Sequence, residues 1–545
     1  MARGTASGSA PGGFDAGSLP DAARAGMALA HWSAQQPHVP AIVSPHGDRT
    51  FAELNGRANR LARALRRCGL GPGDALALMV ANRPEFAETV AACQRTGMRF
   101  TPINWHLTAD EVAYIVADCR ARAFVADARF AGVAAAAAER APGAEVRVAV
   151  GGGIPGFTPY DEAVAAEDPT DLADPVLGGS MLYTSGTTGR PKGVHRSEQP
   201  PTTALARAFG YEPGASVHLC TGPLYHAAPL AFSLAAPLNA GAGVVLMDGW
   251  SPGETLRLVA EHRITHSHLV PTMFHRLLRV PEHERAATDV SSLRLVLHGA
   301  APCPVHVKRA MIEWWGPVLV EYYAATEGVG TFVTSQQWLE RPGTVGRPPS
   351  PDHIRVVDPA TGEDLPPGEV GTIYIKAPDR GRFEYFGDAA KTRSSYLGDH
   401  FTMGDVGYLD NDGYLYLTDR SADLIISGGV NVYPAEVEAE LLAHPDVGDA
   451  AVIGVPDDEW GEIVVAVVEP GPGIEPSTRL ADRLAAHCRE HLAGFKCPRR
   501  VEFVAQLPRT DTGKLYKRRL REEYRSRAAQ AAGHTGRAGA RTTPG

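Results

Sequence analysis

The chain has 545 residues, of which 44% are hydrophobic, 21% charged and 7% aromatic, with 58 glycines and 43 prolines. This composition is typical of a folded protein rich in turns, and it excludes intrinsic disorder and collagen-like repeats. A formal net charge of -9 disfavours non-specific nucleic-acid binding and a basic membrane-binding surface, so a polyanionic ligand would need local cations.

The cysteines and the apolar segments indicate the cellular compartment of the protein. Seven cysteines are scattered without a C-x-x-C pair, which indicates neither a disulfide framework nor a structural zinc site. The N-terminal stretch up to about Leu19 lacks the apolar run of a secretory signal. Prolines interrupt the most apolar window, Ala228 to Met247, and therefore favour a buried helix followed by a strand. We expect a cytoplasmic protein without a membrane span.

Helical and strand-like segments alternate in the first part of the chain. A capping box, Thr50-x-x-Glu53, opens a helix with an apolar stripe, and a second box, Thr108-x-x-Glu111, opens another. The apolar runs expected to be strands are Ala75 to Val80, Phe100 to Ile103 and Ala123 to Ala126. Such alternation predicts an α/β fold whose large N-terminal domain has doubly wound mixed sheets.

After about residue 420 the pattern changes to a smaller α+β module. Its predicted elements are a glycine turn at 427–429, a helix opened by Pro434, strands at 450–455 and 463–468, a helix at 477–492 and a last strand near 500–504. We predict a disordered tail at 1–20, a large domain at 21–420, a small mobile domain at 421–525 and a second disordered tail at 526–545.

The stretch from Tyr183 to Gly193 reads YTSGTTGRPKG. Hydroxyl side chains, glycines and a lysine in one loop can wrap a polyphosphate with amides, hydroxyls and an ammonium group. The same composition is typical of a polar hairpin tip, and the spacing is not that of a Walker A loop. On these residues alone, both interpretations stay open.

This stretch resembles the signature loop of the adenylate-forming superfamily, which includes acyl-CoA synthetases, luciferases and the adenylation domains of peptide synthetases. Later segments resemble the superfamily's further motifs in their usual order. They read PLYH at 223–226, YAATE at 323–327, FTMGD at 401–405, DRSADLIISGG at 419–429 and PRTDTGK at 508–514. The resemblance covers nearly the whole chain and implies an AMP-dependent ligase of acyl-CoA synthetase type that uses ATP, Mg²⁺ and coenzyme A.

The resemblance also implies which residues bind the nucleotide and coenzyme A. These are Thr184, Ser185, Gly186, Thr187, Thr188, Gly189, Lys192, Gly299, Ala300, Ala301, Tyr322, Tyr323, Ala324, Asp405, Arg420, Gly428, Gly429 and Trp460. Asp405 has enough lone pairs to accept both ribose hydroxyls, Arg420 would add a second ribose contact, and Tyr323 would stack on adenine. Without the motif series, Asp405 would be explained as a turn aspartate.

Four residues are expected to carry the chemistry: Lys514, Thr326, Glu327 and His226. ATP and a carboxylate repel each other, so adenylation needs cations where the two meet. By resemblance Lys514 serves the α-phosphate and the carboxylate, Thr326 touches the α-phosphate, and Glu327 is the metal ligand. His226 would orient the carboxylate or yield its place to the thiol, although a histidine beside Tyr and Leu is more often a packed core residue.

Two half-reactions are implied: a carboxylate displaces pyrophosphate to give acyl-AMP, and a thiol then displaces AMP. In relatives the small domain rotates between the two steps about a position that is Ala422 here, where many relatives have Asp or Lys. That departure, with Cys497 where some relatives have a basic residue, keeps other second steps open. They include loading of a carrier protein, oxidation of the adenylate, and adenylation of nitrite for diazotisation of an aryl amine.

The segments around the expected acyl pocket contain no charged residue, so a mainly apolar acyl or aryl carboxylate is favoured. Ala324, where many relatives have glycine, argues mildly against a wide tunnel.

A scaffold that binds nucleotide without catalysis should lack Thr326, Glu327 or Lys514, and all three are present. The sequence leaves the acid, the pathway and the oligomeric state open, a homodimer included.

Overall fold

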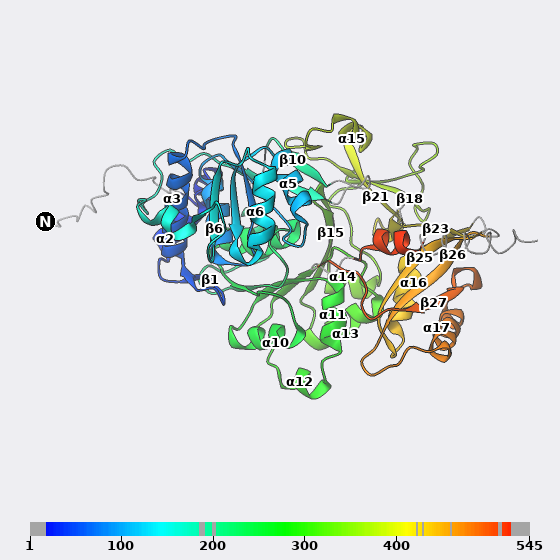
Figure 1. Cartoon of the computed structure of the whole chain (residues 1–545). Coiled ribbons are helices and arrows are strands. Elements are labelled where there is room, and N and C mark those ends of the chain that lie inside the picture. Colours follow the sequence, from blue (N-terminus) through cyan, green and yellow to red (C-terminus); the bar gives the residue numbers. More distant parts are fainter. Residues whose placement is uncertain are drawn as a thin grey trace, which may run out of the picture. The chain divides into compact units, whose positions relative to one another are not determined.

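The computed structural model describes residues 18–184, 191–198, 203–420, 423–427, 430–457, 460–510 and 515–524. The chain divides into two compact units, and both contain helices and strands (Figure 1). The first comprises Met1–Leu269, Val280–Leu297 and Ala377–Ser394, and the second comprises Val270–Arg279, His298–Lys376 and Ser395–Gly545.

The first unit contains a sheet with strand order β7-β6-β5-β3-β4-β8, whose neighbouring strands are all parallel. Its strands are β3 (Ala75–Met79), β4 (Arg99–Pro102), β5 (Ala121–Asp127), β6 (Val146–Val150), β7 (Thr158–Pro159) and β8 (Gly179–Ser180). The connecting helices are α3 (Phe51–Arg67), α4 (Pro84–Gln94), α5 (Ala109–Asp118), the short 3₁₀ turn η1 (Ala128–Phe130), α6 (Ala131–Arg140) and α7 (Tyr160–Ala165). The three predicted strands and both helices opened by capping boxes are confirmed.

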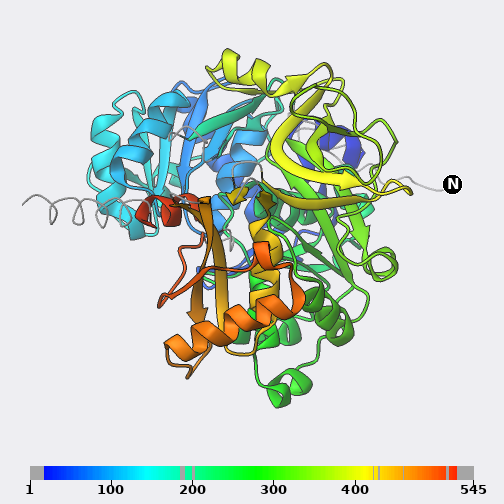
Figure 2. The same cartoon turned by 90° about the vertical axis from the view of Figure 1, so that its right-hand side faces the viewer.

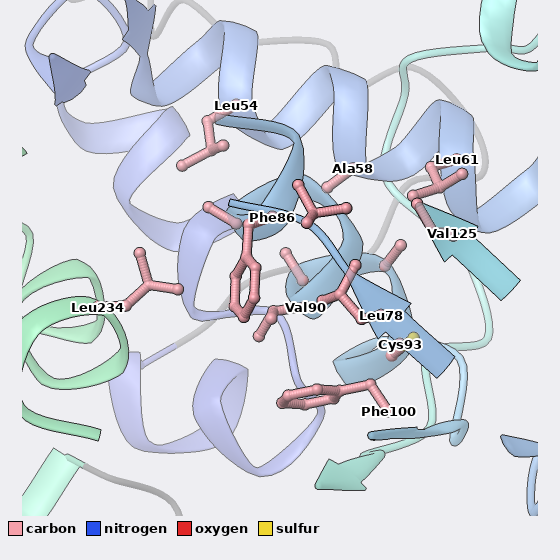
Figure 3. Close-up of a cluster of buried hydrophobic side chains, with 14 of the residues drawn as sticks. Leu54, Ala58, Leu61, Leu78, Phe86, Val90, Cys93, Phe100, Val125 and Leu234 are labelled. Atoms are coloured by element: carbon pink, nitrogen blue, oxygen red, sulfur yellow. The ribbon is translucent and has the colours of Figure 1, made fainter. Parts of the chain in front are cut away.

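Side chains alternate between the two faces of this sheet, which explains why both faces carry helices. Leu76 and Leu78 of β3 belong to the apolar cluster of α3 and α4, whereas Ala77 and Met79 belong to that of α5 and α6. Figure 3 shows the first cluster, in which side chains of α3 and α4 gather over the sheet: Leu54, Ala58, Leu61, Phe86 and Val90 with Leu78 and Val125. The doubly wound arrangement is therefore confirmed.

A second sheet of the first unit has the order β14-β13-β11-β12-β1-β2. Its strands are β1 (Pro40–Val43), β2 (Arg49–Thr50), β11 (Val217–Cys220), β12 (Gly243–Leu246), β13 (His266–Leu269) and β14 (Leu295–His298). A small antiparallel sheet, β19-β10-β9, joins β9 (Leu182–Thr184), β10 (Lys192–Arg196) and β19 (Phe383–Tyr385). The remaining helices are α1 (Leu19–Arg24), α2 (Ala28–Gln35), α8 (Thr203–Ala208), the π-helix η2 (Pro229–Ala235), α9 (Ala236–Asn239), α10 (Pro252–Glu261), α12 (Glu282–Ala287) and α15 (Ala389–Ser394).

The first described helix begins earlier than the sequence predicts, whereas the apolar window folds as expected. Helix α1 starts at Leu19, inside the predicted tail, because the Ser18 hydroxyl accepts from the amide of Asp21 and caps it. Residues 1–17 and 525–545 lie outside the described residues. The apolar window folds as η2 and α9 followed by β12, as expected, and none of the helices described above or below is both long and apolar enough to cross a bilayer.

The second unit begins with α11 (Pro271–Leu278), α13 (Val305–Trp315), the hairpin β15 (Leu319–Ala325) and β16 (Gly328–Thr334), and α14 (Ser335–Glu340). An antiparallel sheet follows in the order β17-β18-β21-β20, with β22 also paired to β21. Its strands are β17 (Ile354–Val357), β18 (Gly371–Lys376), β20 (Tyr396–Leu397), β21 (His400–Leu409) and β22 (Leu415–Arg420).

The last sheet, β24-β23-β26-β25 with β27 beside β26, forms the C-terminal module of this unit, seen in yellow-orange to red in Figure 2. Its elements are β23 (Ile425–Ser427), β24 (Val430–Val432), α16 (Pro434–Ala443), β25 (Val447–Asp457), β26 (Gly461–Pro470), α17 (Thr478–His491), η3 (Gly494–Lys496) and β27 (Arg500–Phe503). The predicted helices and strands are confirmed here, whereas the domain border near 420 stays a prediction.

Both faces of this C-terminal sheet are covered. Val452 and Val464 cluster with apolar side chains of α16 and α17, while Ile453 and Val465 cluster with Leu507, Leu520 and Tyr524 of the final segment. A strand buried on both faces needs apolar residues at consecutive positions. The unbroken apolar runs in β25 and β26 follow from that requirement.

Candidate active site

The two strands that flank the glycine- and hydroxyl-rich stretch pair with each other in the first unit. Thr184 at the end of β9 lies opposite Lys192 at the start of β10 in the antiparallel register. The hydroxyl and the ammonium expected to bind phosphate therefore stand at the two ends of the same loop. Ser185, Gly186, Thr187, Thr188 and Gly189 lie outside the described residues, so their predicted role stays a prediction.

Lys192 already has an anionic partner. Its Nζ lies 2.6 Å from Oδ2 of Asp388, next to the start of α15, and the Lys192 side chain is 19% exposed. The hydrogen bond from Lys192 holds the pKa of Asp388 below its ordinary value. Since the two residues are far apart in sequence, only the fold reveals this pair. A phosphate bound at Lys192 would either contact the ammonium group alongside Asp388 or displace the Asp388 carboxylate from it.

The turn that carries His226 is fixed by a buried amide. The side chain of Asn82 donates to the carbonyl oxygens of Gly222 (3.0 Å) and Met247 (3.1 Å), and its Oδ1 accepts from the amide of Leu224 at 3.0 Å. An amide that satisfies three backbone groups orders the loop without adding charge. His226 follows this turn and is partly buried.

Aromatic rings line the same turn. The rings of Tyr225 and His226 lie 4.5 Å apart, and Trp105 meets Tyr225 edge-on at 4.5 Å. Trp105 in turn stacks on Phe130 at 5.7 Å. Aromatic pairs in such geometries contribute about 0.5–1.5 kcal/mol beyond the area that they bury. Trp105 was not singled out from the sequence, because a lone tryptophan in a loop has no pattern that separates a pocket wall from a core residue.

In the second unit, Gly299 allows two backbone segments to meet. A Cβ at this position would lie 2.6 Å from the carbonyl oxygen of Tyr322, so only glycine fits. The next residue, Ala300, has a φ of 69°, a left-handed conformation that costs an L-residue about 1–2 kcal/mol. Burial raises the pKa of the Tyr322 hydroxyl. Strain and close approach thus coincide at the predicted stretch 299–301.

Two residues predicted to hold the nucleoside are in contact. The Tyr323 hydroxyl donates to Oδ2 of Asp405 at 2.8 Å, and the two residues are only 6% and 8% exposed. Asp405 on β21 also lies opposite Arg420 on β22, although the side chain of Arg420 is outside the described part. The structure therefore brings the three predicted nucleoside residues to neighbouring positions on β15, β21 and β22.

The turn of the β15–β16 hairpin contains Thr326 and Glu327. Glu327 is 8% exposed, and the pairing of the hairpin is irregular between Tyr323 and Ala324. Two glycines of β16 complete the packing, because a Cβ on Gly328 would lie 2.5 Å from the Phe401 ring and one on Gly330 would lie 2.6 Å from the Tyr323 ring. In the sequence, the two glycines at alternate positions of this strand were the signal that could have predicted the close approach of the aromatic rings.

A buried ion pair supports the hairpin. Nζ of Lys308 on α13 lies 2.6 Å from Oε2 of Glu321 on β15, with side chains 0% and 6% exposed. Burial raises the pKa of Glu321, and the neighbouring Lys308 opposes that rise. His298 lies 3.9 Å from the same carboxylate oxygen. The pair anchors β15 two residues before Tyr323.

The described residues on either side of Lys514 pair with each other and with β25. Lys514 itself, like Gly428 and Gly429, lies outside the described residues. Arg509 and Leu515 form an isolated antiparallel bridge, and Arg509 donates to both carboxylate oxygens of Asp449 on β25, at 2.5 and 2.6 Å. Such bidentate pairing fixes orientation as well as distance. The PRTDTGK segment is thus attached to the C-terminal module.

Trp460 pairs with a cation. The guanidinium carbon of Arg499 lies 3.8 Å from the centroid of the Trp460 ring. A guanidinium stacked on an aromatic face keeps its charge and its edge donors for a phosphate. The structure thus places Trp460 beside a basic residue within the second unit.

Comparisons with known proteins agree on one family. A family model described as AMP-binding enzyme matches residues 29–382, and one described as AMP-binding enzyme C-terminal domain matches residues 436–514. A feruloyl-CoA synthase from an Amycolatopsis species is 37% identical over 497 residues, covering 90% of this chain and 96% of that protein. A fatty acid–[acyl-carrier-protein] ligase, ScoC, from Streptomyces coeruleorubidus is 34% identical over 508 residues, covering 90% of this chain and 94% of that protein.

The crystal structure of the anthranilate CoA ligase AuaEII with anthranoyl-AMP superimposes with a TM-score of 0.83 at 26% identity, covering 93% of this chain and 98% of that one. The fold and these matches together define an adenylate-forming enzyme. The chain belongs to the AMP-binding enzyme family, as an AMP-forming acid–thiol ligase of acyl-CoA synthetase type. The resemblance, the mixed α/β fold with a separate C-terminal domain and the enzyme class are thereby confirmed.

Proposed function

We propose that the protein activates an aromatic or other apolar carboxylate with ATP, releasing pyrophosphate, and transfers the acyl group from acyl-AMP to the thiol of coenzyme A. The observation that carries this proposal is the buried contact between Tyr323 and Asp405 next to the Thr326–Glu327 turn. Tyr323 and Asp405 belong to motifs that are 82 positions apart, and a single nucleoside site requires such a contact between them.

The nucleoside would bind against this contact. One oxygen of Asp405 accepts from Tyr323, which orients the carboxylate, and a carboxylate has lone pairs enough to accept from ribose hydroxyls as well. Arg420, opposite Asp405 in register, would supply the second ribose contact. The adenine would lie along Tyr323 and the 299–301 stretch. The phosphate role of Thr184 and Lys192 is proposed from the motif resemblance alone.

Cations carry the first half-reaction in this scheme. The buried carboxylate of Glu327 in a tight turn is a hard oxygen ligand of the kind Mg²⁺ prefers, so it fits the role of metal ligand. When bound, Mg²⁺ would reduce the repulsion between phosphate and carboxylate. Thr326 would donate to the α-phosphate, Lys514 would neutralise charge on the attacking carboxylate and the α-phosphate, and His226 would border the acyl group.

Coenzyme A is the proposed acceptor in the second half-reaction. The Arg499–Trp460 stack offers a ring and a cation for its nucleotide portion. Gly428 and Gly429 would let the backbone approach the pantetheine arm. The relative that loads an acyl-carrier protein supports a second candidate, transfer to a carrier-protein thiol. Both acceptors require the small domain, proposed to span 421–525, to alternate between the two steps about Ala422.

Aromatic carboxylates are the first substrates to test. The feruloyl-CoA synthase and the anthranilate CoA ligase are named for aromatic acids. Tyr225, whose ring contacts both His226 and Trp105, would offer an aromatic surface to an aryl group. The cytoplasmic location and a homodimer stay predictions.

The proposal is tested by pyrophosphate release over aromatic, short-, medium- and long-chain acids, each with and without coenzyme A. We expect acid-dependent pyrophosphate release, AMP formation that coenzyme A accelerates, and a thioester product. Lys514→Ala should slow adenylate formation about 100- to 1000-fold but keep thioester formation from supplied acyl-AMP. AMP formation indifferent to coenzyme A but accelerated by a phosphopantetheinylated carrier would favour the second candidate. Native-rate adenylation by Lys514→Ala would refute the assignment.

A further inference from the structure

The two helices of the C-terminal module present a cluster of metal-ligating side chains that the proposed reaction does not use. It consists of Glu440 on α16 and of His487 and His491 on α17. The histidines are four residues apart, which places them on the same face of the helix. One ligand atom from each of the three side chains lies within 4.8 Å of the others. Figure 1 shows both helices within the C-terminal module.

The geometry around Glu440 is already close to that of a bound ion. Its Oε1 lies 3.2 Å from Nε2 of His487 and 3.1 Å from Nδ1 of His491. With bonds of about 2.0–2.2 Å, the ligand atoms of a tetrahedral zinc ion are about 3.3 Å apart. The two separations from Glu440 therefore need only a small adjustment to admit an ion, while the two histidine nitrogens lie within 4.8 Å of each other.

Each of these imidazole nitrogens also contacts a carbonyl oxygen. Nε2 of His487 lies 3.1 Å from the backbone oxygen of Glu440, and Nδ1 of His491 lies 3.0 Å from that of His487. Protons bridge these atoms when no ion is bound. A metal would replace those protons, because only the unprotonated nitrogen is a ligand.

Two basic neighbours of the cluster, Arg483 and His444, both contact Asp446. Arg483, one turn before His487 on α17, pairs with Asp446, so its charge is offset. His444 stands 5.2 Å from the His487 ring, and its Nδ1 accepts from the amide of Asp446. The cluster of converging ligand atoms does not include His444, which is therefore a neighbour of the site.

We propose that Glu440, His487 and His491 form a binding site for a borderline divalent cation of the Zn²⁺ class, with a fourth position open to water. Two imidazoles and one carboxylate are a recurrent zinc ligand set. Imidazole suits zinc, nickel and copper, whereas Mg²⁺ prefers oxygen ligands, so the site would be selective over the Mg²⁺ that accompanies ATP. The ion would join α16 to α17 and stabilise the C-terminal module.

The test is titration of the full chain, free of any histidine tag, with Zn²⁺ in excess Mg²⁺, followed by calorimetry and thermal unfolding. His491→Ala is the main variant because this side chain is 50% exposed and its loss should not disturb folding. Glu440→Gln is a second variant of the same size. His444→Ala and His283→Ala, the latter 83% exposed and in the other unit, are matched controls.

We expect the wild-type chain and both controls to bind one more equivalent of Zn²⁺ than His491→Ala, or to bind that equivalent more than about 10-fold tighter. Zn²⁺ should raise the unfolding temperature of the wild type and not that of His491→Ala. Cobalt should show tetrahedral absorption bands in the wild type, and these bands should disappear in both site variants. Equal zinc stoichiometry and affinity in the wild type and His491→Ala, or no zinc binding by the wild type, would overturn the proposal.

Discussion

Breaking the buried Lys308–Glu321 pair should destabilise the protein far more when one partner is removed than when both are. The side chains are 0% and 6% exposed and 2.6 Å apart, so removing either residue leaves the other buried without its ion-pair partner. We expect Lys308→Met or Glu321→Leu to lower the free energy of unfolding by about 3–5 kcal/mol. The double variant removes both charges and keeps the volume apolar, so it should lie within about 1 kcal/mol of the native protein or above it.

Urea unfolding followed by tryptophan fluorescence and far-UV circular dichroism measures these differences. Trp338 is a suitable reporter, since Nζ of Lys308 lies 4.8 Å from its ring centroid. The exposed pair Arg518–Glu522 is a matched control, and Arg518→Ala should change stability by less than about 0.5 kcal/mol. Single variants costing less than about 1 kcal/mol, or a double variant equal to the sum of the singles, would refute this reasoning.

Three further predictions follow from the same units. Asp405→Asn should lower kcat/KM for ATP by about 10- to 100-fold, because a charge-assisted hydrogen bond to ribose is worth about 1.5–3 kcal/mol; an unchanged value in steady-state kinetics would remove Asp405 from the site. Gly299→Ala should destabilise the chain by about 1–3 kcal/mol in urea, since its methyl group would meet the Tyr322 carbonyl at 2.6 Å. Burial lowers the pKa of both His266 and His268 to about 4. The unfolded chain therefore takes up protons below about pH 6.5 that the folded chain refuses, and stability should fall between about pH 6.5 and 4 by up to about 3 kcal/mol for each histidine. His268→Asn should reduce that pH dependence in acid titrations monitored by circular dichroism, and an unchanged slope would contradict the assignment.

Elements with strong local signals were predictable from the sequence. The capping boxes at Thr50 and Thr108 located two helices, because both partners of each box lie within one turn. In the C-terminal module, Ser477 caps α17 and Pro434 opens α16, and both boundaries agree with the prediction. Helix α1 was missed because its signal, a single serine before proline, lay inside a stretch of low-complexity composition.

Ion pairs between residues that only the fold brings together could not be predicted from the sequence. Lys192 and Asp388 are separated by 196 positions, and no periodicity links them. The Lys308–Glu321 pair also escaped, since the sequence shows only two charged residues that would ordinarily be solvated. For the candidate site, motif resemblance assigned Tyr323 to adenine and Asp405 to ribose, and the structure shows the two residues in contact. Periodicity and composition alone would have left Asp405 as a turn residue.

The covering of both faces of the C-terminal sheet has a consequence for any shortened form of the enzyme. The segment that bears Lys514 also supplies Leu507, Leu520 and Tyr524, which shield Ile453 and Val465 from water. Deleting this segment would expose apolar side chains of the sheet to water, in addition to removing the Lys514 ammonium group. Truncated chains should therefore aggregate. Their loss of activity would not test the role of Lys514.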